Sequence, residues 1–223
     1  MSWFRRAWFW YLDYWFVSWW QLRHVFTGRE PGELASGDAA PVLLLPGVYE
    51  TWQFLRPIAE RLHSAGHPIH ILSGLGYNRQ PIADAAALAA RYLAEHDLTG
   101  VVIVAHSKGG LIGKHLMAID DTRHRVDRMV AIATPFGGSV YAKYIPVRTI
   151  RVFSPMDATI ARLGANLTIN ARITSIYGEF DPHIPGGSHL DGARNVQLPV
   201  LGHFRILREE RVLAAAERAV RDA

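Results

Sequence analysis

Short runs of apolar residues alternate with longer amphipathic stretches along most of the chain. Residues 42–45 are all apolar and are ended by Pro46-Gly47, and residues 101–105 form a longer run of the same kind. Continuous apolar runs of this length are typical of strands that are buried on both faces. The stretches between the runs repeat apolar residues at helical spacing and begin or end near Pro or Gly. The pattern predicts strands at 42–45, 69–72, 101–105, 129–133, 173–177 and 195–198, and helices at 52–65, 81–95, about 108–119 and about 207–220.

The order of these elements predicts the fold class. Strands of four to six residues that alternate with helices imply right-handed crossovers and a mostly parallel sheet with helices on both faces. We therefore expect an α/β protein. Residues 136–172 contain no strand of comparable strength, so we expect a helix or a small cap inserted there.

Composition divides the chain into three parts. With 223 residues and 49% hydrophobic residues, it suits one domain with a sizeable core, which we place at 42–223. Residues 27–41 are rich in Gly, Pro, Ser and acids and are interpreted as a linker. The formal charge is +4, but the arginines are scattered, so nothing supports a nucleic-acid surface. The absence of cysteine excludes disulfides and thiolate chemistry.

The segment 1–26 is unusual because it holds 12 of the 24 aromatic residues. Trp and Tyr favour the membrane–water interface, so we interpret the segment as an interfacial anchor; a helix packed on the protein or on a partner chain is the alternative. Asp13 interrupts the aromatic stretch, which also lacks a small-residue cleavage site and is short for a bilayer span. The expected location is cytoplasmic or peripheral at the membrane, without a cleavable signal peptide.

The strongest chemical motif is Ala105-His106-Ser107-Lys108-Gly109, which follows a predicted strand and precedes a predicted helix. It is a variant of the G-x-S-x-G nucleophile elbow, in which a serine protrudes from a strained turn between small residues. Ser107 is therefore the candidate nucleophile. Two backbone N–H groups should hold the developing oxyanion: that of Lys108, and one from the turn after the first strand, for which we choose Val48.

The acid and the base are chosen by their place after later strands. Asp181 follows the strand at 173–177; Glu179 is a local alternative and Asp157 a more distant one. His203 follows the last strand and completes the order Ser, Asp, His. We expect His106 to pack against or orient the elbow, and we assign His183 and His189 to loops. No spacing of His, Asp and Glu resembles a metal site.

With these residues placed, the chain resembles the α/β-hydrolase superfamily over roughly 42–220, and more narrowly the small bacterial class 2 lipases, which have little or no lid. The narrower likeness depends on residues 104–110 and on 190–197 followed by Gly202-His203. The resemblance implies a serine esterase or lipase that acts on acyl esters without a cofactor. It agrees with Ser107, Asp181 and His203 as a triad and with Val48 and Lys108 as oxyanion donors.

Two positions depart from the family. The usual His-Gly of the oxyanion turn is Pro46-Gly47, and Lys108 stands where these lipases carry Met or another uncharged residue. The Lys108 ammonium could meet an anionic group of the substrate, but we favour its reaching solvent.

Three functions compete at this point. An ester hydrolase that acts on small-molecule or lipid esters is the first. An acyltransferase with the same acyl-enzyme is the second, and a non-catalytic, membrane-associated binding protein is the third.

Overall fold

The computed structural model describes residue 13 and residues 31–222, and its centre is a six-stranded parallel sheet. The strand order is β2-β1-β3-β4-β5-β6, and every neighbouring pair is parallel. This confirms the predicted α/β class. The strands are β1 (Val42–Leu45), β2 (Ile69–Ile71), β3 (Val101–His106), β4 (Val126–Ile132), β5 (Ile173–Phe180) and β6 (Arg194–Leu201).

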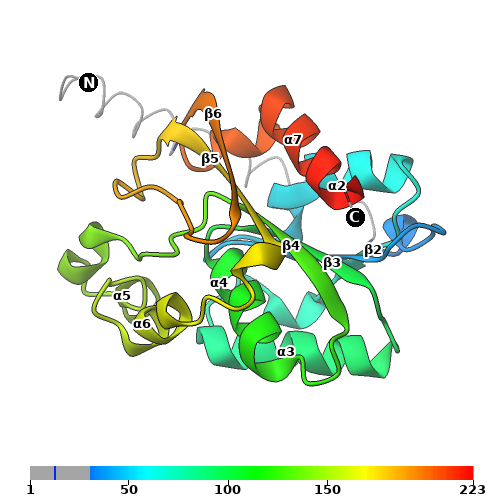
Figure 1. The fold of residues 1–223 in the computed structure, drawn as a ribbon, viewed down its shortest axis with the longest axis horizontal. Helices are drawn as coiled ribbons and strands as arrows, with labels where there is room; N and C mark the ends of the chain where they lie inside the picture. Colours follow the sequence, from blue (N-terminus) through cyan, green and yellow to red (C-terminus); the bar gives the residue numbers. More distant parts are fainter. Residues whose placement is uncertain (1–12, 14–30, 223) are drawn as a thin grey trace.

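Alternate residues of the inner strands supply two separate cores. Leu43 and Leu45 of β1 face one side, where α3 (Ile82–Glu95) and α4 (Lys108–His115) cover the sheet. Val42 and Leu44 face the other side, which is covered by α2 (Arg56–Ser64) and α7 (Glu210–Arg221). Figure 1 shows α3 and α4 on one face and α2 and α7 on the other. Side chains that alternate across a buried sheet explain why the inner strands are continuously apolar.

Element boundaries differ from the predicted ones where polar residues belong to a strand or where a helix changes its winding. β4 starts at Val126, before the predicted start at residue 129. The apolar pattern misses this part of the strand because Asp127 and Arg128 are polar. β5 and β6 each run three residues past their predicted ends. The helix after Ser107 is α-helical to His115 and continues as a π-helical turn, η4 (Leu116–Asp120).

The insertion after β4 consists of short helices, as expected for a small cap. They are η5 (Val140–Tyr144), α5 (Arg148–Arg151), α6 (Ala158–Ala165) and η6 (Asn170–Arg172). Phe153, Ile160 and Leu163 of this insertion join the core on the α3 and α4 side. The insertion therefore extends one side of the sheet rather than forming a separate body.

The remaining short helices join the strands to these layers: η1 (Pro31–Leu34), η2 (Trp52–Leu55), η3 (Ser73–Leu75) and η7 (Arg205–Arg208). Leu34 lies in the segment interpreted as a linker, yet it is buried in the α2 and α7 core. The proposed anchor, apart from Asp13, lies outside the described residues. Within the described part of the chain, no helix has the length and apolar character needed to cross a membrane.

Candidate active site

Ser107 lies on a sharp turn between β3 and α4. Its backbone has φ 50° and ψ −119°, a conformation that side-chain-bearing residues adopt rarely and that marks stored strain. Close packing enforces the turn: a Cβ on Gly109 would lie 1.9 Å from the carbonyl oxygen of Leu45, and one on Gly110 would lie 2.0 Å from Thr134 Oγ1. The glycines that follow the serine are therefore required by the backbone and side chains against which the elbow packs.

The three side chains predicted as a triad form one hydrogen-bonded chain. The Ser107 hydroxyl lies 3.0 Å from His203 Nε2, and His203 Nδ1 lies 2.6 Å from Asp181 Oδ2. The other Asp181 oxygen accepts from the N–H groups of His183 and Ile184, at 2.7 and 3.0 Å. All three triad side chains are buried. The arrangement places a hydroxyl against one nitrogen of an imidazole whose other nitrogen contacts a carboxylate.

Burial and charge compete at Asp181 and His203. Burial alone would raise the pKa of Asp181, but the charge and hydrogen bond of His203 and the His183 N–H outweigh it and lower that pKa. For His203, burial would lower the pKa, whereas Asp181, through charge and hydrogen bond, and the charges of Asp13 and Glu50 raise it above the ordinary value. The site therefore favours the imidazolium that a general base becomes after it takes a proton.

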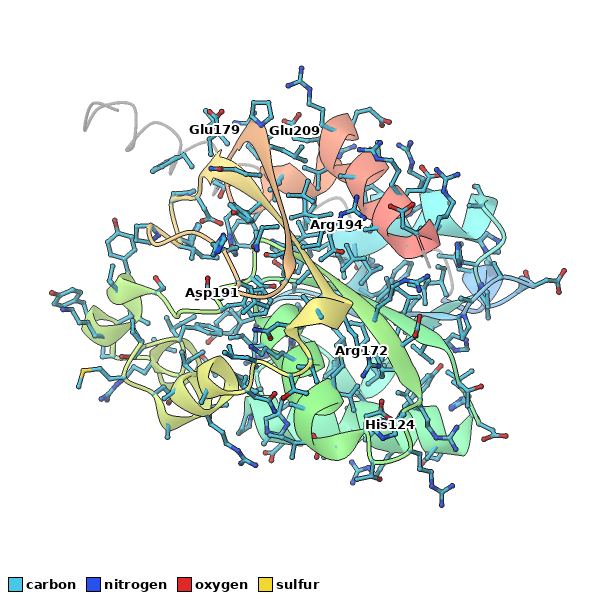
Figure 2. The ribbon with its side chains drawn as sticks, in the orientation of Figure 1. His124, Arg172, Glu179, Asp191, Arg194 and Glu209 are labelled. Carbon is cyan, nitrogen blue, oxygen red and sulfur yellow. The ribbon has the colours of Figure 1, made fainter. Side chains whose placement is uncertain are left out.

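The alternative acids lie elsewhere. Glu179 is exposed and lies at the edge of the molecule in Figure 2. Asp157 caps α6, where its Oδ1 accepts from Thr159 N at 2.8 Å. His189 is exposed and pairs with Asp191. None of these side chains has a contact with Ser107 or His203 among the described residues.

The turn expected to supply an oxyanion donor follows β1. Gly47 N donates to Glu50 Oε2 at 2.7 Å, and Tyr49 N donates to the carbonyl oxygen of Tyr77 at 2.8 Å. These bonds fix the peptide groups on both sides of Val48, which lines the same cavity as Ser107. The N–H of Lys108 lies at the start of α4, where the helix dipole favours negative charge. Neither N–H has an acceptor within the described residues, and both stay our predicted oxyanion donors.

Comparison with solved structures identifies the architecture. No protein-family model matches the sequence, and the search of curated proteins finds no match. The mature lipase BlEst2 of Bacillus licheniformis superposes with a TM-score of 0.65 at 15% identity, over 83% of this chain and 92% of that one. The chain has the α/β-hydrolase fold.

Two further solved structures are similar to the chain. Lipase B of Aspergillus fumigatus gives a TM-score of 0.65 at 19% identity, over 82% of this chain and 52% of that chain. An extracellular α/β-hydrolase of a Paenibacillus species gives 0.58 at 18% identity, over 82% of this chain and 98% of its own. Identities this low establish the fold, and a fold alone does not establish a reaction.

The Lys108 side chain has a different role from either one we expected. Its side chain is 1% exposed, and Nζ donates to the carbonyl oxygens of Asn78 and Gln80, at 2.8 and 2.5 Å. The expectation that the ammonium reaches solvent is wrong, because carbonyl groups of a neighbouring loop satisfy it below the surface. Burial lowers the pKa of Lys108 to about 8. Asn78 Nδ2 donates to the Pro46 carbonyl oxygen at 2.7 Å, so the same loop ties the elbow to the oxyanion turn.

Four further side chains lie at this site. Asp13, Glu50 and His183 belong to no motif in the sequence, whereas His106 is part of the elbow motif, which predicts that it packs against or orients the elbow. Asp13 accepts from the backbone of His203, and His106 lies between Glu50 and the His203 carbonyl oxygen. The ring of His183 lies 5.0 Å from that of His203, centroid to centroid. Burial and the charge of His203 lower the pKa of His183 to about 3. A possible sequence signal for Asp13 is that it is an isolated acid in an aromatic stretch, and for Glu50 that it lies just after the oxyanion turn.

An apolar cavity of about 400 Å³ opens beside Ser107 and His203. Its walls come from the oxyanion turn, η2 and the insertion, and include Val48, Phe54, Tyr141, Ile145, Ile150 and Phe153. Tyr49, on the same turn, joins the insertion through a 2.7 Å hydrogen bond between its hydroxyl and Thr149 Oγ1. The size and lining are those of a small-molecule site.

Proposed function

We propose that this α/β-hydrolase is a serine hydrolase that cleaves carboxylic esters through an acyl-enzyme on Ser107. The observation that carries the proposal is the chain of contacts from Ser107 through His203 to Asp181, which begins at the wall of the apolar cavity. A hydroxyl next to a neutral imidazole is a nucleophile with its base in place. Asp181 keeps the proton of His203 on Nδ1, so that Nε2 is free to accept from Ser107.

The reaction proceeds in two halves. Ser107 Oγ attacks the ester carbonyl carbon as its proton moves to His203 Nε2, and the carbonyl π electrons move to the oxygen, which the N–H groups of Val48 and Lys108 hold. The C–O bond to the alcohol then breaks, and His203 returns the proton to the leaving oxygen. In the second half, water gives a proton to His203 and attacks the acyl carbon. The bond from that carbon to Ser107 Oγ then breaks, and His203 returns the proton to Oγ, which releases the acid and restores Ser107.

The cavity favours an apolar acyl group. Apolar side chains dominate its lining, and four of its polar residues, Ser107, His203, Glu50 and His183, lie around the nucleophile. Burying acyl methylenes there gains about 0.8 kcal/mol each. Two of the neighbours described above are named lipases, which supports the same substrate class.

Turnover of p-nitrophenyl esters of increasing chain length tests the proposal. We expect wild-type protein to release nitrophenol and Ser107→Ala to lose at least about 10⁴-fold in kcat while it keeps its fold. A parallel reaction with an added alcohol, analysed by product mass, distinguishes hydrolysis from acyl transfer. Turnover that survives unchanged in Ser107→Ala would refute the proposal.

We further propose that the aromatic segment 1–26 brings the enzyme to a lipid surface, a reading supported by its Trp and Tyr content. Vesicle flotation of the full chain, compared with a full-length variant whose six tryptophans within residues 1–20 are replaced by Gln, tests it. The proposal requires that wild type floats and the variant does not. Equal behaviour of the two proteins would exclude the anchor.

A further inference from the structure

The backbone N–H and the backbone carbonyl oxygen of His203 each form a hydrogen bond with a buried ionisable side chain outside the triad. The His203 N–H donates to Asp13 Oδ2 at 2.8 Å. The His203 carbonyl oxygen lies 3.0 Å from Nε2 of His106, which in turn bonds to Glu50. Asp13 and His106 are 0% exposed and Glu50 is 2% exposed. Hydrogen bonds therefore hold His203 at its backbone as well as at its ring.

Asp13 caps the loop that carries His203. Its carboxylate also lies 3.3 Å from the N–H groups of Phe204 and Arg205, so three successive donors converge on one side chain. A Cβ on Gly202 would lie 3.0 Å from Asp13 Oδ1, and Gly202 has φ +107°. The loop therefore takes a shape that both exposes its N–H groups and leaves room for this acid.

Glu50 and His106 fix the other side of the same residue. Glu50 accepts from His106 Nδ1 at 2.8 Å and from Gly47 N at 2.7 Å. Glu50 therefore contacts the ring that holds the His203 carbonyl oxygen and the backbone of the turn after β1 at the same time. Because Gly47 precedes Val48, this pair also joins the loop of the base to the turn that supplies an oxyanion donor.

Charge points the same way as geometry. A buried carboxylate is costly unless N–H groups or opposite charges compensate it. The three loop N–H groups compensate the carboxylate of Asp13. The ring of His183, 3.7 Å away, adds no positive charge, because burial and the charge of His203 lower the pKa of His183 to about 3. The charges of Asp13 and Glu50 both raise the pKa of His203. They stabilise the imidazolium that forms at His203 when Ser107 attacks.

We propose that Asp13 and the Glu50–His106 pair are positioning residues that hold the main chain of His203 from both sides, so that Asp13, distant in sequence, supplies part of the active site. The proposal rests on the proposed function, because it assigns His203 as the base. It gives Asp13 a role separate from any contact of residues 1–26 with lipid.

The test uses the full chain with Asp13→Asn, Asp13→Ala and Glu50→Gln. Misplacing a catalytic group by about 1 Å costs up to about 100-fold, so we expect kcat to fall about 10- to 100-fold with KM within about twofold, and Asp13→Ala to be the most affected. Asp38→Asn and Glu95→Gln, which replace exposed acids, are the matched controls and should behave as wild type.

The pH dependence separates positioning from a structural role. The titratable groups that face or act on His203 are Asp181, Asp13, Glu50, His106 and His183. Removing a negative charge destabilises the imidazolium, so Asp13→Asn and Glu50→Gln lower the pKa of His203. The acidic limb of kcat should then move to lower pH, and the titration of the His203 ring, followed by NMR, should move with it.

The outcomes are distinct. If wild type is active and Ser107→Ala is not, but Asp13→Asn and Glu50→Gln match wild type in kcat and in the His203 titration, the positioning proposal is overturned and the function stands. A loss of thermal stability with an unmoved His203 titration also overturns it, because that indicates a structural role alone. If wild type has no turnover, the proposed function fails, and the NMR titration alone decides whether Asp13 and Glu50 act on His203. Asp13→Asn keeps the shape of the side chain, so it serves even where Asp13→Ala does not fold.

Discussion

The elbow that carries Ser107 and the loop that carries His203 are held in place by different interactions, although Ser107 Oγ lies only 3.0 Å from His203 Nε2. The elbow is fixed by close packing of Gly109 against the backbone of Leu45 and Pro46 and of Gly110 against the side chain of Thr134, just after β4. The loop is fixed by carboxylates: Asp181 at the ring, Asp13 at the N–H, and Glu50 through His106 at the carbonyl oxygen. Packing fixes a shape, whereas charges fix a shape and also change the proton affinity of His203.

This contrast predicts which measurements each region should affect. A change in the elbow should affect stability first, because a Cβ there overlaps rigid backbone. A change in the acids around the loop should affect kcat and its pH dependence, with a smaller effect on folding. The variants below test the contrast from the largest expected effect to the smallest.

The largest effect is expected for Asp181→Asn. The Asn oxygen can still accept from His183 N and Ile184 N, but its amide then faces His203 Nδ1 as a donor. The proton of His203 would move to Nε2, which could no longer accept from Ser107, so kcat should fall by about 10⁴-fold. Steady-state kinetics with a thermal melt checks this, and the melting temperature should change little.

Asp157→Asn and Glu179→Gln are the matched controls for that variant. Both residues were alternatives to Asp181 in the sequence, and neither contacts Ser107 or His203 among the described residues. Both variants should keep wild-type kcat. If either control loses activity while Asp181→Asn keeps it, the assignment of Asp181 as the acid is wrong.

Gly109→Ala should act on the elbow through stability. Its Cβ would lie 1.9 Å from the Leu45 carbonyl oxygen, so β1 or α4 must move, at a cost of about 3 kcal/mol or more in the free energy of unfolding. Gly164→Ala in α6 is the control, because nothing lies within 4 Å of its Cβ and Ala favours a helix. Denaturant unfolding of both variants decides; equal stability would contradict the packing account of the elbow.

Lys108→Met tests the contact between the elbow and the loop at 77–80. Loss of the ammonium leaves the carbonyl groups of Asn78 and Gln80 without this donor, which lowers the free energy of unfolding by about 1–3 kcal/mol. Removal of a buried charge offsets part of that loss. Burial lowers the pKa of Lys108 to about 8 from 10.5. Unfolded chains therefore bind one more proton than folded ones between those values, and wild-type stability gains on the variant as pH rises through that range. A stability difference that is flat from pH 8 to 10.5 would show that the ammonium is not desolvated.

The sequence predicted the elbow better than the loop for a physical reason. Val101–His106, Ser107 and Gly109 are neighbours along the chain, so one strand, one turn and one helix start specify their geometry. The order of strands was enough to nominate Asp181 and His203. Asp13 lies 190 residues before His203, and its interaction with that backbone depends on folding that no local pattern encodes.

Lys108 shows the same limit on a smaller scale. The sequence predicts correctly that a helix starts after Ser107. The partners of the Lys108 ammonium, however, depend on where the loop at 77–80 lies. The boundaries of β4 were missed because Asp127 and Arg128 are polar residues on a strand that reaches the surface at its start. Long-range contacts and polar strand ends are what the hydrophobic pattern leaves unspecified.

The central claim is that Ser107 is the nucleophile, and labelling with a fluorophosphonate tests it most directly. The reagent phosphonylates a serine hydroxyl as its fluoride leaves, and the adduct is located by peptide mass mapping. We expect one adduct, on Ser107, in wild type and in the Asp38→Asn control, and none in Ser107→Ala. An unlabelled wild-type protein, or an adduct on another serine that persists in Ser107→Ala, would contradict the account.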